Sequence, residues 1–328
     1  DRKGVILAGA RPAYSVIMPV DRKGNTLSDD ELQKLSVLLK MPVADLKKKI
    51  EDNKRAFGAI YLANDVGVDV ATQIEEKKDD FPGIQIEVNP LRVYPLGAAG
   101  AQVLGYVGEA GPDDKDADGN PYTTATLIGR AGIERKYNQY LEGKNGSKTI
   151  EVNASGQPVG YVGGTPAVSG NNIRLTLDAN LQKAAEDAID SQVKILAKSG
   201  IYATGASAVA IDPNSGAVLA MVSEPSYDPN RFSKGISTAD WNQIINNKNH
   251  PMQNRTIASM YPPGSLFKVV TGAAALEAKV MSPTERIFDS GKHWLVDKRN
   301  AQGEAFGWID FYEALEKSDN VYFYEMGR

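Results

Sequence analysis

A serine and a lysine that follow a tight turn are the residues of this chain best placed to do chemistry. The turn is Tyr261-Pro262-Pro263-Gly264, Ser265 comes directly after it, and Lys268 lies three positions further on. The residues after Lys268 are strong helix formers, so the pattern predicts that Ser265 stands at a helix N-terminus. Unpaired N–H groups and the positive end of the helix dipole would lie beside its hydroxyl. This environment suits a nucleophile whose attack creates an oxyanion.

Lys268 supplies the base that such a nucleophile needs. The spacing predicts that the Ser265 and Lys268 side chains share one helix face within hydrogen-bonding range. The residues around Lys268, from 266 to 276, are almost all apolar, which predicts a buried helix. A buried lysine is costly unless it is paired or its pKa is lowered. A neutral lysine beside a serine hydroxyl is a general base, so the pair predicts acyl transfer through Ser265.

A second copy of this spacing shows how much the context matters. Ser191 and Lys194 are also three residues apart, but they lie among charged residues in a predicted helix with no turn before them. That copy is predicted to be part of a solvated surface. The spacing alone is therefore weak, and the turn and the apolar helix distinguish Ser265.

The tripeptide Ser318-Asp319-Asn320 is the second candidate element. It follows the helix-forming segment 309–317, which predicts a turn between two helices where small polar side chains can point into a cleft. The alternative is a simple cap for a helix from Val321 to Met326. Both interpretations stay open on the residues alone.

Two apolar runs upstream predict the sheet that positions these elements. They are residues 206–211 and 217–222, and the loop between them, Asp212-Pro213-Asn214-Ser215-Gly216, has turn chemistry at every position. Because both runs are nearly all apolar, we expect strands buried on both faces. The pattern predicts a central antiparallel sheet with helices on each side, which is an α/β sandwich.

The remaining elements are predicted from periodicity and from caps. The front of the chain is mixed α and β, and the Gly-, Pro- and Ser-rich segment Gly156–Asn172 is the best candidate for a domain boundary. The predicted strands are 5–8 and 14–18, joined by a turn, then 84–88, which Asn89-Pro90 ends, and 173–177. The predicted helices begin at a capping box opened by Ser28, at Ala44 and at Asp178, the last running to Lys198 and stopping at Gly200.

Composition narrows the class of protein. With 328 residues, 42% of them hydrophobic and 24% charged, the chain is globular and long enough for two domains. The net charge of −4 argues against nucleic acid as a partner. The absence of cysteine excludes disulfides, iron–sulfur sites and thiol catalysis. No run of 18 or more apolar residues is present, so no transmembrane helix is predicted within the chain.

Metal binding is not expected, and neither is a cofactor. Residues Asp114–Gly119 match the first half of a calcium loop, but position twelve is Ala125 where a glutamate is needed, which favours a solvated acidic loop. His250 and His293 are far apart in the sequence and lack a plausible set of further ligands. A Ser-His triad is therefore not predicted.

The motifs together resemble a known family. Ser-x-x-Lys at Ser265 and Ser-Asp-Asn at Ser318 are similar to two of the three motifs shared by penicillin-binding proteins and class A β-lactamases. Asn254-Arg255 with the block from Tyr261 to Lys268 resembles class B penicillin-binding proteins more specifically. Segments that resemble the start of their transpeptidase domain and their N-terminal pedestal are 211–230, 91–95, 105–108 and 129–143.

This resemblance carries further implications for the type of enzyme. A β-lactamase has no pedestal, so β-lactam hydrolysis is a distant alternative. Residues 320–325 resemble the elongation-type branch more than the division type.

The resemblance also implies roles for four residues. Ser265 would attack the carbonyl of a stem peptide ending in D-Ala-D-Ala, with Lys268 as its base. Ser318 would relay a proton to the leaving D-alanine, and Asn320 would hold the substrate amide. An amine of a neighbouring stem would then resolve the acyl-enzyme into a cross-link, and β-lactams would trap Ser265.

The implied architecture is an α+β multidomain protein. A pedestal would occupy residues 1–172, and a transpeptidase α/β sandwich would occupy 173–328. One departure is that no Lys-Thr-Gly follows Ser318; Lys198-Ser199-Gly200 comes earlier and is predicted to end a helix. We therefore expect a piece of a longer enzyme, weakly active or inactive as it stands, whose membrane anchor and last motif are missing.

Partners and location follow from the same resemblance. We expect stem peptides and β-lactams as ligands, a RodA-like membrane glycosyltransferase as partner, and a place on the extracytoplasmic face of the cell membrane. The alternative hypothesis is a non-catalytic scaffold or a β-lactam-sensing module that contacts the same glycosyltransferase.

Overall fold

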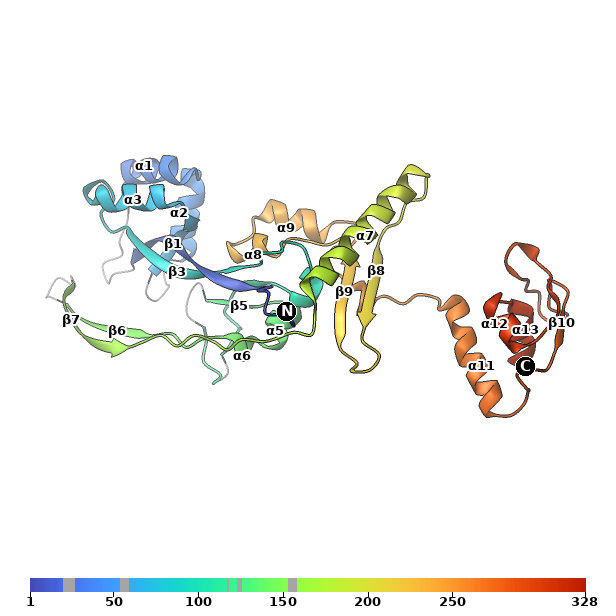
Figure 1. Cartoon of the computed structure of the whole chain (residues 1–328). Coiled ribbons are helices and arrows are strands. Elements are labelled where there is room, and N and C mark those ends of the chain that lie inside the picture. The colour runs from blue at the N-terminus through green and yellow to red at the C-terminus, as the bar shows by residue number, and fades with distance from the viewer. Residues whose placement is uncertain (20–26, 54–58, 117, 123–125, 153–157) are drawn as a thin grey trace. The chain divides into compact units, whose positions relative to one another are not determined.

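The computed structural model describes residues 1–19, 27–53, 59–116, 118–122, 126–152 and 158–328. The chain divides into two compact units, Asp1–Ser259 and Met260–Arg328, and both mix helices with antiparallel strands (Figure 1). Each unit is defined by the contacts among its own residues, and such a unit need not coincide with a domain. The domain boundary expected between residues 172 and 173 stays a prediction.

A three-stranded antiparallel sheet organises the front of the first unit. Its strands are β1 (Gly9–Pro19), β2 (Ala59–Val66) and β3 (Gln85–Val93), with β1 in the centre. The helices that pack against it are α1 (Asp29–Leu39), α2 (Val43–Asp52) and α3 (Val68–Glu76), and the short 3-10 helix η1 (Lys78–Asp80) follows α3. Val16 and Met18, which alternate along β1, are buried together with Leu35 of α1 and Leu46 of α2.

The start of the chain differs from the predicted hairpin. Residues 5–8 form no strand, because Asp1 folds the terminus back by accepting hydrogen bonds from the N–H groups of Lys3 and Val5. β1 is one long strand that passes through Pro12. β3 likewise continues through Asn89-Pro90, and Pro90 lies opposite Pro12. Every second pair in an antiparallel ladder exchanges no hydrogen bonds, so two facing prolines can share such a pair.

The predicted capping box at Ser28 is confirmed. The Ser28 hydroxyl accepts from the Glu31 N–H at 3.3 Å, and the Glu31 carboxylate accepts from the Ser28 N–H at 2.6 Å. Both bonds satisfy amide groups that a helix start would otherwise leave open to solvent.

Replacing Ser28 by alanine is expected to destabilise α1 by about 1 kcal/mol, because the first turn loses its acceptor. Amide hydrogen exchange within α1 should become faster by the factor that this loss of free energy implies. Ser28→Asp keeps a hydrogen-bond acceptor at the cap and should leave the exchange rates nearly unchanged. Equal exchange in both variants would show that the cap does not stabilise this helix.

Short elements follow the first sheet. They are α4 (Ala101–Leu104), β4 (Val107–Glu109), β5 (Leu127–Gly129), α5 (Gly132–Lys136), α6 (Asn138–Leu141), β6 (Ser147–Val152) and β7 (Pro158–Thr165). β4 pairs with β5, and β6 pairs with β7, both antiparallel. The predicted linker Gly156–Asn172 therefore contains a strand, because its small residues pair with β6 instead of remaining an open connection.

A long helix and a hairpin complete the first unit. They are α7 (Ala179–Lys198), β8 (Ala206–Ile211) and β9 (Val218–Glu224), followed by the short helices α8 (Asn230–Ser233), α9 (Thr238–Ile245) and α10 (Arg255–Ala258). Asp178 caps α7 through the N–H groups of Asn180 and Leu181, and Gly200 follows its end with a φ of +78°, both as predicted. The Gln182 side chain pairs with both backbone groups of Met221, which ties α7 to β9.

Two expectations about this region are wrong. Residues 173–177 form no strand, because they face no complete partner strand and make only scattered bonds such as Arg2 N–H to Leu177 C=O. The hairpin itself is confirmed, but its strands are not buried on both faces. The residues of β9 are buried or half-buried, whereas β8 exposes Val209 and Ile211, since α7 and α10 leave much of β8 uncovered.

The second unit is small and carries the candidate site. Its elements are η2 (Gly264–Leu266), α11 (Phe267–Glu277), β10 (Ile287–Asp289), η3 (Ala301–Gly303), β11 (Gly307–Ile309), α12 (Phe311–Glu316) and α13 (Asn320–Met326). β10 and β11 pair antiparallel, and α11 packs on α13. The core joins Ala275 of α11 to Ala314 of α12 and Tyr322 of α13. Nowhere in the described part of the chain is a helix long and apolar enough to cross a membrane.

Candidate active site

Ser265 lies in the short 3-10 turn η2 that leads directly into α11. Gly264 precedes it with a φ of +57°, a conformation that glycine adopts without strain and that completes the Pro-Pro-Gly turn. The Ser265 side chain is exposed to solvent. The predicted helix N-terminus is confirmed, with one turn of 3-10 helix between the nucleophile candidate and the α-helix.

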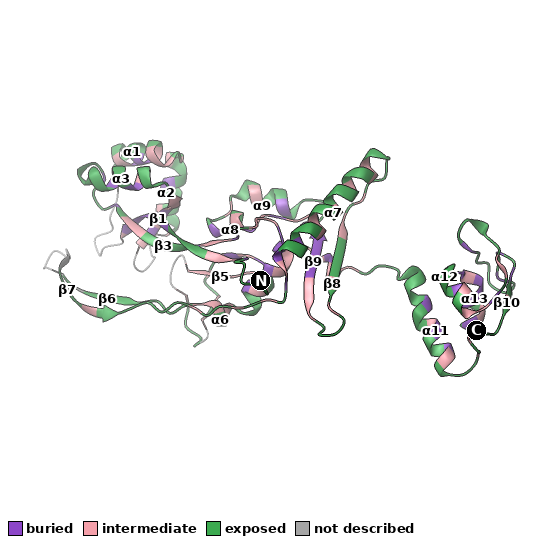
Figure 2. Cartoon of the chain, in the orientation of Figure 1, coloured by how far each residue is buried: buried purple, intermediate pink, exposed green. Residues whose placement is uncertain are grey.

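Lys268 is buried, but the helix around it is not. Lys268 is 9% exposed, whereas Leu266, Phe267 and Val270 are more than half exposed, and α11 is largely green in Figure 2. The expectation of a buried helix is therefore wrong for most of α11. Only the stripe of Lys268, Gly272 and Ala275 faces the core, because these positions repeat at the helical period.

The Lys268 ammonium group contacts the Ser318 residue twice. Its Nζ donates to the Ser318 hydroxyl at 3.1 Å and to the Ser318 backbone carbonyl at shorter range. The Phe323 ring lies 5.9 Å from Nζ. Burial lowers the pKa of Lys268, and the negative charge of Asp319 opposes that shift. The environment therefore shifts the lysine toward its neutral form relative to a solvated lysine.

Ser318 joins the lysine to the nucleophile candidate. Its hydroxyl donates to the Ser265 Oγ at 2.9 Å, so Lys268, Ser318 and Ser265 form one chain of hydrogen bonds. The prediction that Lys268 bonds Ser265 directly is wrong within the described residues, because the lysine reaches across to the turn before α13. Rotation of the two hydroxyls would let a proton pass from Ser265 through Ser318 to a neutral Lys268.

The turn that carries Ser318 has an uncommon backbone. Ser318 has a φ of +56°, in the left-handed region that a non-glycine residue rarely adopts. The turn joins α12 to α13, as the sequence predicts. Asp319 caps α13 by accepting from the Tyr322 N–H at 2.7 Å. The cap interpretation is therefore confirmed by Asp319, and Ser318 faces Lys268, while the cleft of the other interpretation stays a prediction.

Asn320, the fourth predicted site residue, begins α13. Its side chain is held through the nitrogen of its amide group. Its Nδ2 donates to the Arg299 carbonyl at 2.8 Å, and its backbone N–H donates to the Asn300 Oδ1 at 2.7 Å. Its Oδ1 receives no hydrogen bond from the residues that the structure describes. An amide fixed in this way can accept a hydrogen bond from a substrate N–H.

Sequence reasoning missed the residues that support this turn. Asn300 is buried and bonds the backbone N–H groups of Asn320 and Val321. Its amide also donates to the buried carboxyls of Asp289 and Asp319. No local pattern in the sequence marks Asp289 or Asn300 as part of the site. Their role depends on the fold, which places them behind the Ser318 turn.

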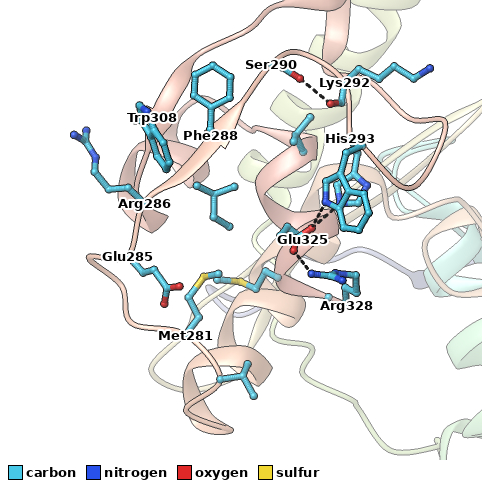
Figure 3. Close-up of a pocket in the computed structure, with 16 residues that line it drawn as sticks. Met281, Glu285, Arg286, Phe288, Ser290, Lys292, His293, Trp308, Glu325 and Arg328 are labelled. Carbon is cyan, nitrogen blue, oxygen red and sulfur yellow. Dashed lines mark hydrogen bonds and ion pairs between the residues drawn. The ribbon is translucent and has the colours of Figure 1, made fainter.

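A cavity of about 960 Å³ lies beside α13 but does not contain the four predicted residues. Phe288 and Trp308 lie together on one side of it, and His293 and Glu325 lie on another (Figure 3). The His293 Nδ1 accepts two backbone N–H groups, so its Nε2 carries the hydrogen that is donated to Glu325 at 3.0 Å. This pair shapes the loop after His293 and does not reach Ser265 by any bond described.

The acidic loop at Asp114 makes bonds of its own. Asp116 accepts from the N–H groups of Asp118 and Asn120, and Asp114 pairs with Arg130 at 2.8 Å. Residue 117 and Ala125, which the calcium argument used, lie outside the described residues. Among the residues that are described, no group of three side chains is arranged to hold a metal ion.

The chain is similar to two known protein families and to several known proteins. The family pattern of the penicillin-binding protein dimerisation domain matches residues 1–175, and that of the penicillin-binding protein transpeptidase domain matches residues 206–328. The peptidoglycan D,D-transpeptidase MrdA of Escherichia coli is 33% identical over 99% of this chain and 51% of its own length. MrdA of Acinetobacter baumannii is 29% identical over 99% of this chain and 47% of its own length. The chain thus spans about half the length of these relatives.

Solved structures agree with the sequence relatives. A complex between penicillin-binding protein 2 and MreC from Helicobacter pylori matches with a TM-score of 0.79 and 27% identity, covering all of this chain and 59% of the matched one. Penicillin-binding protein 2 from the same organism without that partner matches with a TM-score of 0.76 and 26% identity, covering all of this chain and 61% of the matched one. The predicted fold class, mixed α and β with antiparallel sheets flanked by helices, is confirmed. The chain belongs to the penicillin-binding proteins that join a dimerisation domain to a transpeptidase domain.

Proposed function

We propose that the protein is a peptidoglycan D,D-transpeptidase that cross-links stem peptides through an acyl-enzyme on Ser265. The observation that carries the proposal is the hydrogen-bond chain from Lys268 through Ser318 to Ser265, with the lysine buried and the serine open to solvent. The MrdA relatives, which bear the name of this activity, support it. A serine nucleophile with a base in reach and a third group between them is the arrangement that acyl transfer requires.

The proposed reaction follows from the geometry. Neutral Lys268 accepts the Ser265 proton through Ser318 while Oγ attacks the carbonyl between the two terminal D-alanines. N–H groups at the start of the helix face the oxyanion that forms. The proton then returns through Ser318 to the departing D-alanine amine, which leaves an ester on Ser265. The Asn320 Oδ1 accepts a hydrogen bond from the substrate amide and orients the stem peptide. An amine of a second stem attacks the ester and releases Ser265.

The remaining features of the proposal concern the whole protein. Residues 1–172 are proposed as the pedestal and residues 173–328 as part of the transpeptidase domain. Because peptidoglycan is assembled outside the cytoplasm, we place the site on the extracytoplasmic face of the cell membrane, in an elongation-type enzyme. We propose a RodA-like glycosyltransferase as partner, and the complex of the Helicobacter pylori neighbour with MreC adds an MreC-like protein as a second candidate.

The test is turnover of a donor peptide by the complete gene product. We expect release of D-alanine and formation of a cross-linked dimer from a stem peptide ending in D-Ala-D-Ala, with neither product from the same peptide ending in D-Ala-L-Ala. The stereochemical control separates specific acyl transfer from general hydrolysis. If neither product forms and penicillin leaves no adduct, the scaffold hypothesis replaces the enzyme.

A further inference from the structure

Two carboxyl groups that form no ion pair among the described residues are buried behind the turn that carries Ser318. Asp319 is completely buried, and Asp289, at the end of β10, is 1% exposed. The ion pairs of this unit, as far as the structure describes them, join other residues. Two buried carboxylates with no cation at ion-pair distance are costly, so their protonation needs an explanation.

One side chain amide connects the two acids. The Asn300 Nδ2 donates to the Asp289 Oδ2 at 2.8 Å and to the Asp319 Oδ2 at 3.2 Å. The side chains of Asp289 and Asp319 also interact directly with each other, so the two acids are neighbours. Two negative charges this close in a dry site repel each other, so ionisation of both acids at once is disfavoured.

The other hydrogen bonds show where the proton fits. The Asp289 Oδ2 already accepts from the Phe306 N–H at 2.7 Å as well as from Asn300, and its Oδ1 accepts from the Gly291 N–H. The Asp319 Oδ2 has Asn300 as its sole described donor. A proton on that oxygen can therefore be donated to Asp289. In agreement, burial and the neighbouring Asp289 raise the pKa of Asp319.

The charge on Asp319 affects the base of the proposed reaction. An ionised Asp319 raises the pKa of Lys268 and so opposes the neutral form that burial favours. Two other charged groups on the neighbouring helices are engaged elsewhere. Lys317 lies over the Phe306 ring, and Glu325 is bound by His293 and Arg328. Asp319 is thus the acid whose ionisation Lys268 senses.

We propose that Asp289 and Asp319 share one proton, and that this proton keeps Asp319 neutral so that Lys268 can lose its own and act as the base. Asp289 is then a positioning residue that acts through Asp319 on Lys268, and Asn300 holds the two acids together. The inference rests on the proposed function, because it assigns Lys268 the role of base.

The test compares two variants that replace one acid each by its amide. In Asp289→Asn the negative charge beside Asp319 is gone, so Asp319 ionises more readily and the rise of the penicillin acylation rate with pH should move up by roughly one pH unit or more. In Asp319→Asn this position stays uncharged, as it is in the parent protein when the proton is shared, and the charge stays on Asp289. The midpoint of that rise should therefore stay where it is in the parent protein. Both variants are measured in the complete gene product.

A spectroscopic readout makes the result independent of turnover. The infrared spectrum of the parent protein at neutral pH should contain the C=O band of a buried, protonated carboxyl group, and Asp319→Asn should remove it. A midpoint that falls in Asp319→Asn, or stays in place in both variants while only rates change, would overturn the shared proton. If the parent protein forms no acyl-enzyme, the proposed function fails, and the infrared band still decides whether the proton is shared.

Discussion

Replacing Ser265 by alanine is expected to abolish covalent labelling of the protein by a fluorescent penicillin. The Oγ atom of Ser265 is the acceptor of the Ser318 hydroxyl and the end of the hydrogen-bond chain, so its removal takes away the atom that would form the ester. The loss of labelling should be complete. Among the described serines, only Ser265 is linked to a buried lysine by hydrogen bonds through a second hydroxyl group. Gel fluorescence and intact mass measure the adduct directly.

Ser191→Ala is the matched control for this experiment. Ser191 has the same spacing to Lys194 as Ser265 has to Lys268, but Lys194 is exposed and paired with Asp190 on α7. The control should label like the parent protein. Persistent labelling of Ser265→Ala would refute Ser265 as the residue that forms the acyl-enzyme, and loss of labelling in both variants would point to unfolding.

Replacing Lys268 by methionine is expected to slow acylation by penicillin by about 10²–10⁴-fold, the usual contribution of a general base. Methionine has a similar length and suits the buried position, so the core formed with Ala275 and Phe323 should persist. In the parent protein the rate should rise with pH as Lys268 loses its proton. Burial lowers the pKa of Lys268, so that rise is expected below the pH at which a solvated lysine titrates. The variant should lose the rise altogether.

Stopped-flow measurement of acylation across a pH series checks this prediction. Lys194→Met, on the exposed face of α7, is the control and should keep both the rate and the pH profile. A Lys268→Met variant with the parent's rate would show that another group is the base. A variant with a lower rate but an unchanged pH profile would give Lys268 a role in orientation only.

Local signals predicted the elements whose geometry is decided within a few residues. These elements are the capping box at Ser28, the cap at Asp178 and the hairpin loop at 212–216. All three can be predicted from the sequence, because the hydrogen bonds of their backbone groups are made within the same short segment. The strands were harder. Whether the chain stays extended through Pro12 and Pro90 depends on which residues face them across the sheet, and pairing at long range leaves no local mark.

The candidate site divides in the same way. The turn before Ser265 and the helix after it are local, and so is the spacing to Lys268. That Lys268 bonds Ser318 instead of Ser265 depends on how α11 packs on α13, which no spacing encodes. Asp289 and Asn300 are polar residues in a region of β-strand and loop, and their burial behind Ser318 is a result of folding.

The left-handed backbone of Ser318 has a consequence for the balance between stability and activity. A non-glycine residue with a φ of +56° costs about 1–2 kcal/mol relative to an ordinary conformation. Glycine would relieve that strain, but it has no hydroxyl to stand between Lys268 and Ser265. Random mutagenesis selected only for thermal tolerance should therefore drift toward glycine at this position, whereas selection for cell-wall synthesis should hold the serine. Ser318 is therefore a residue that the proposed reaction requires but that the stability of the fold alone does not favour.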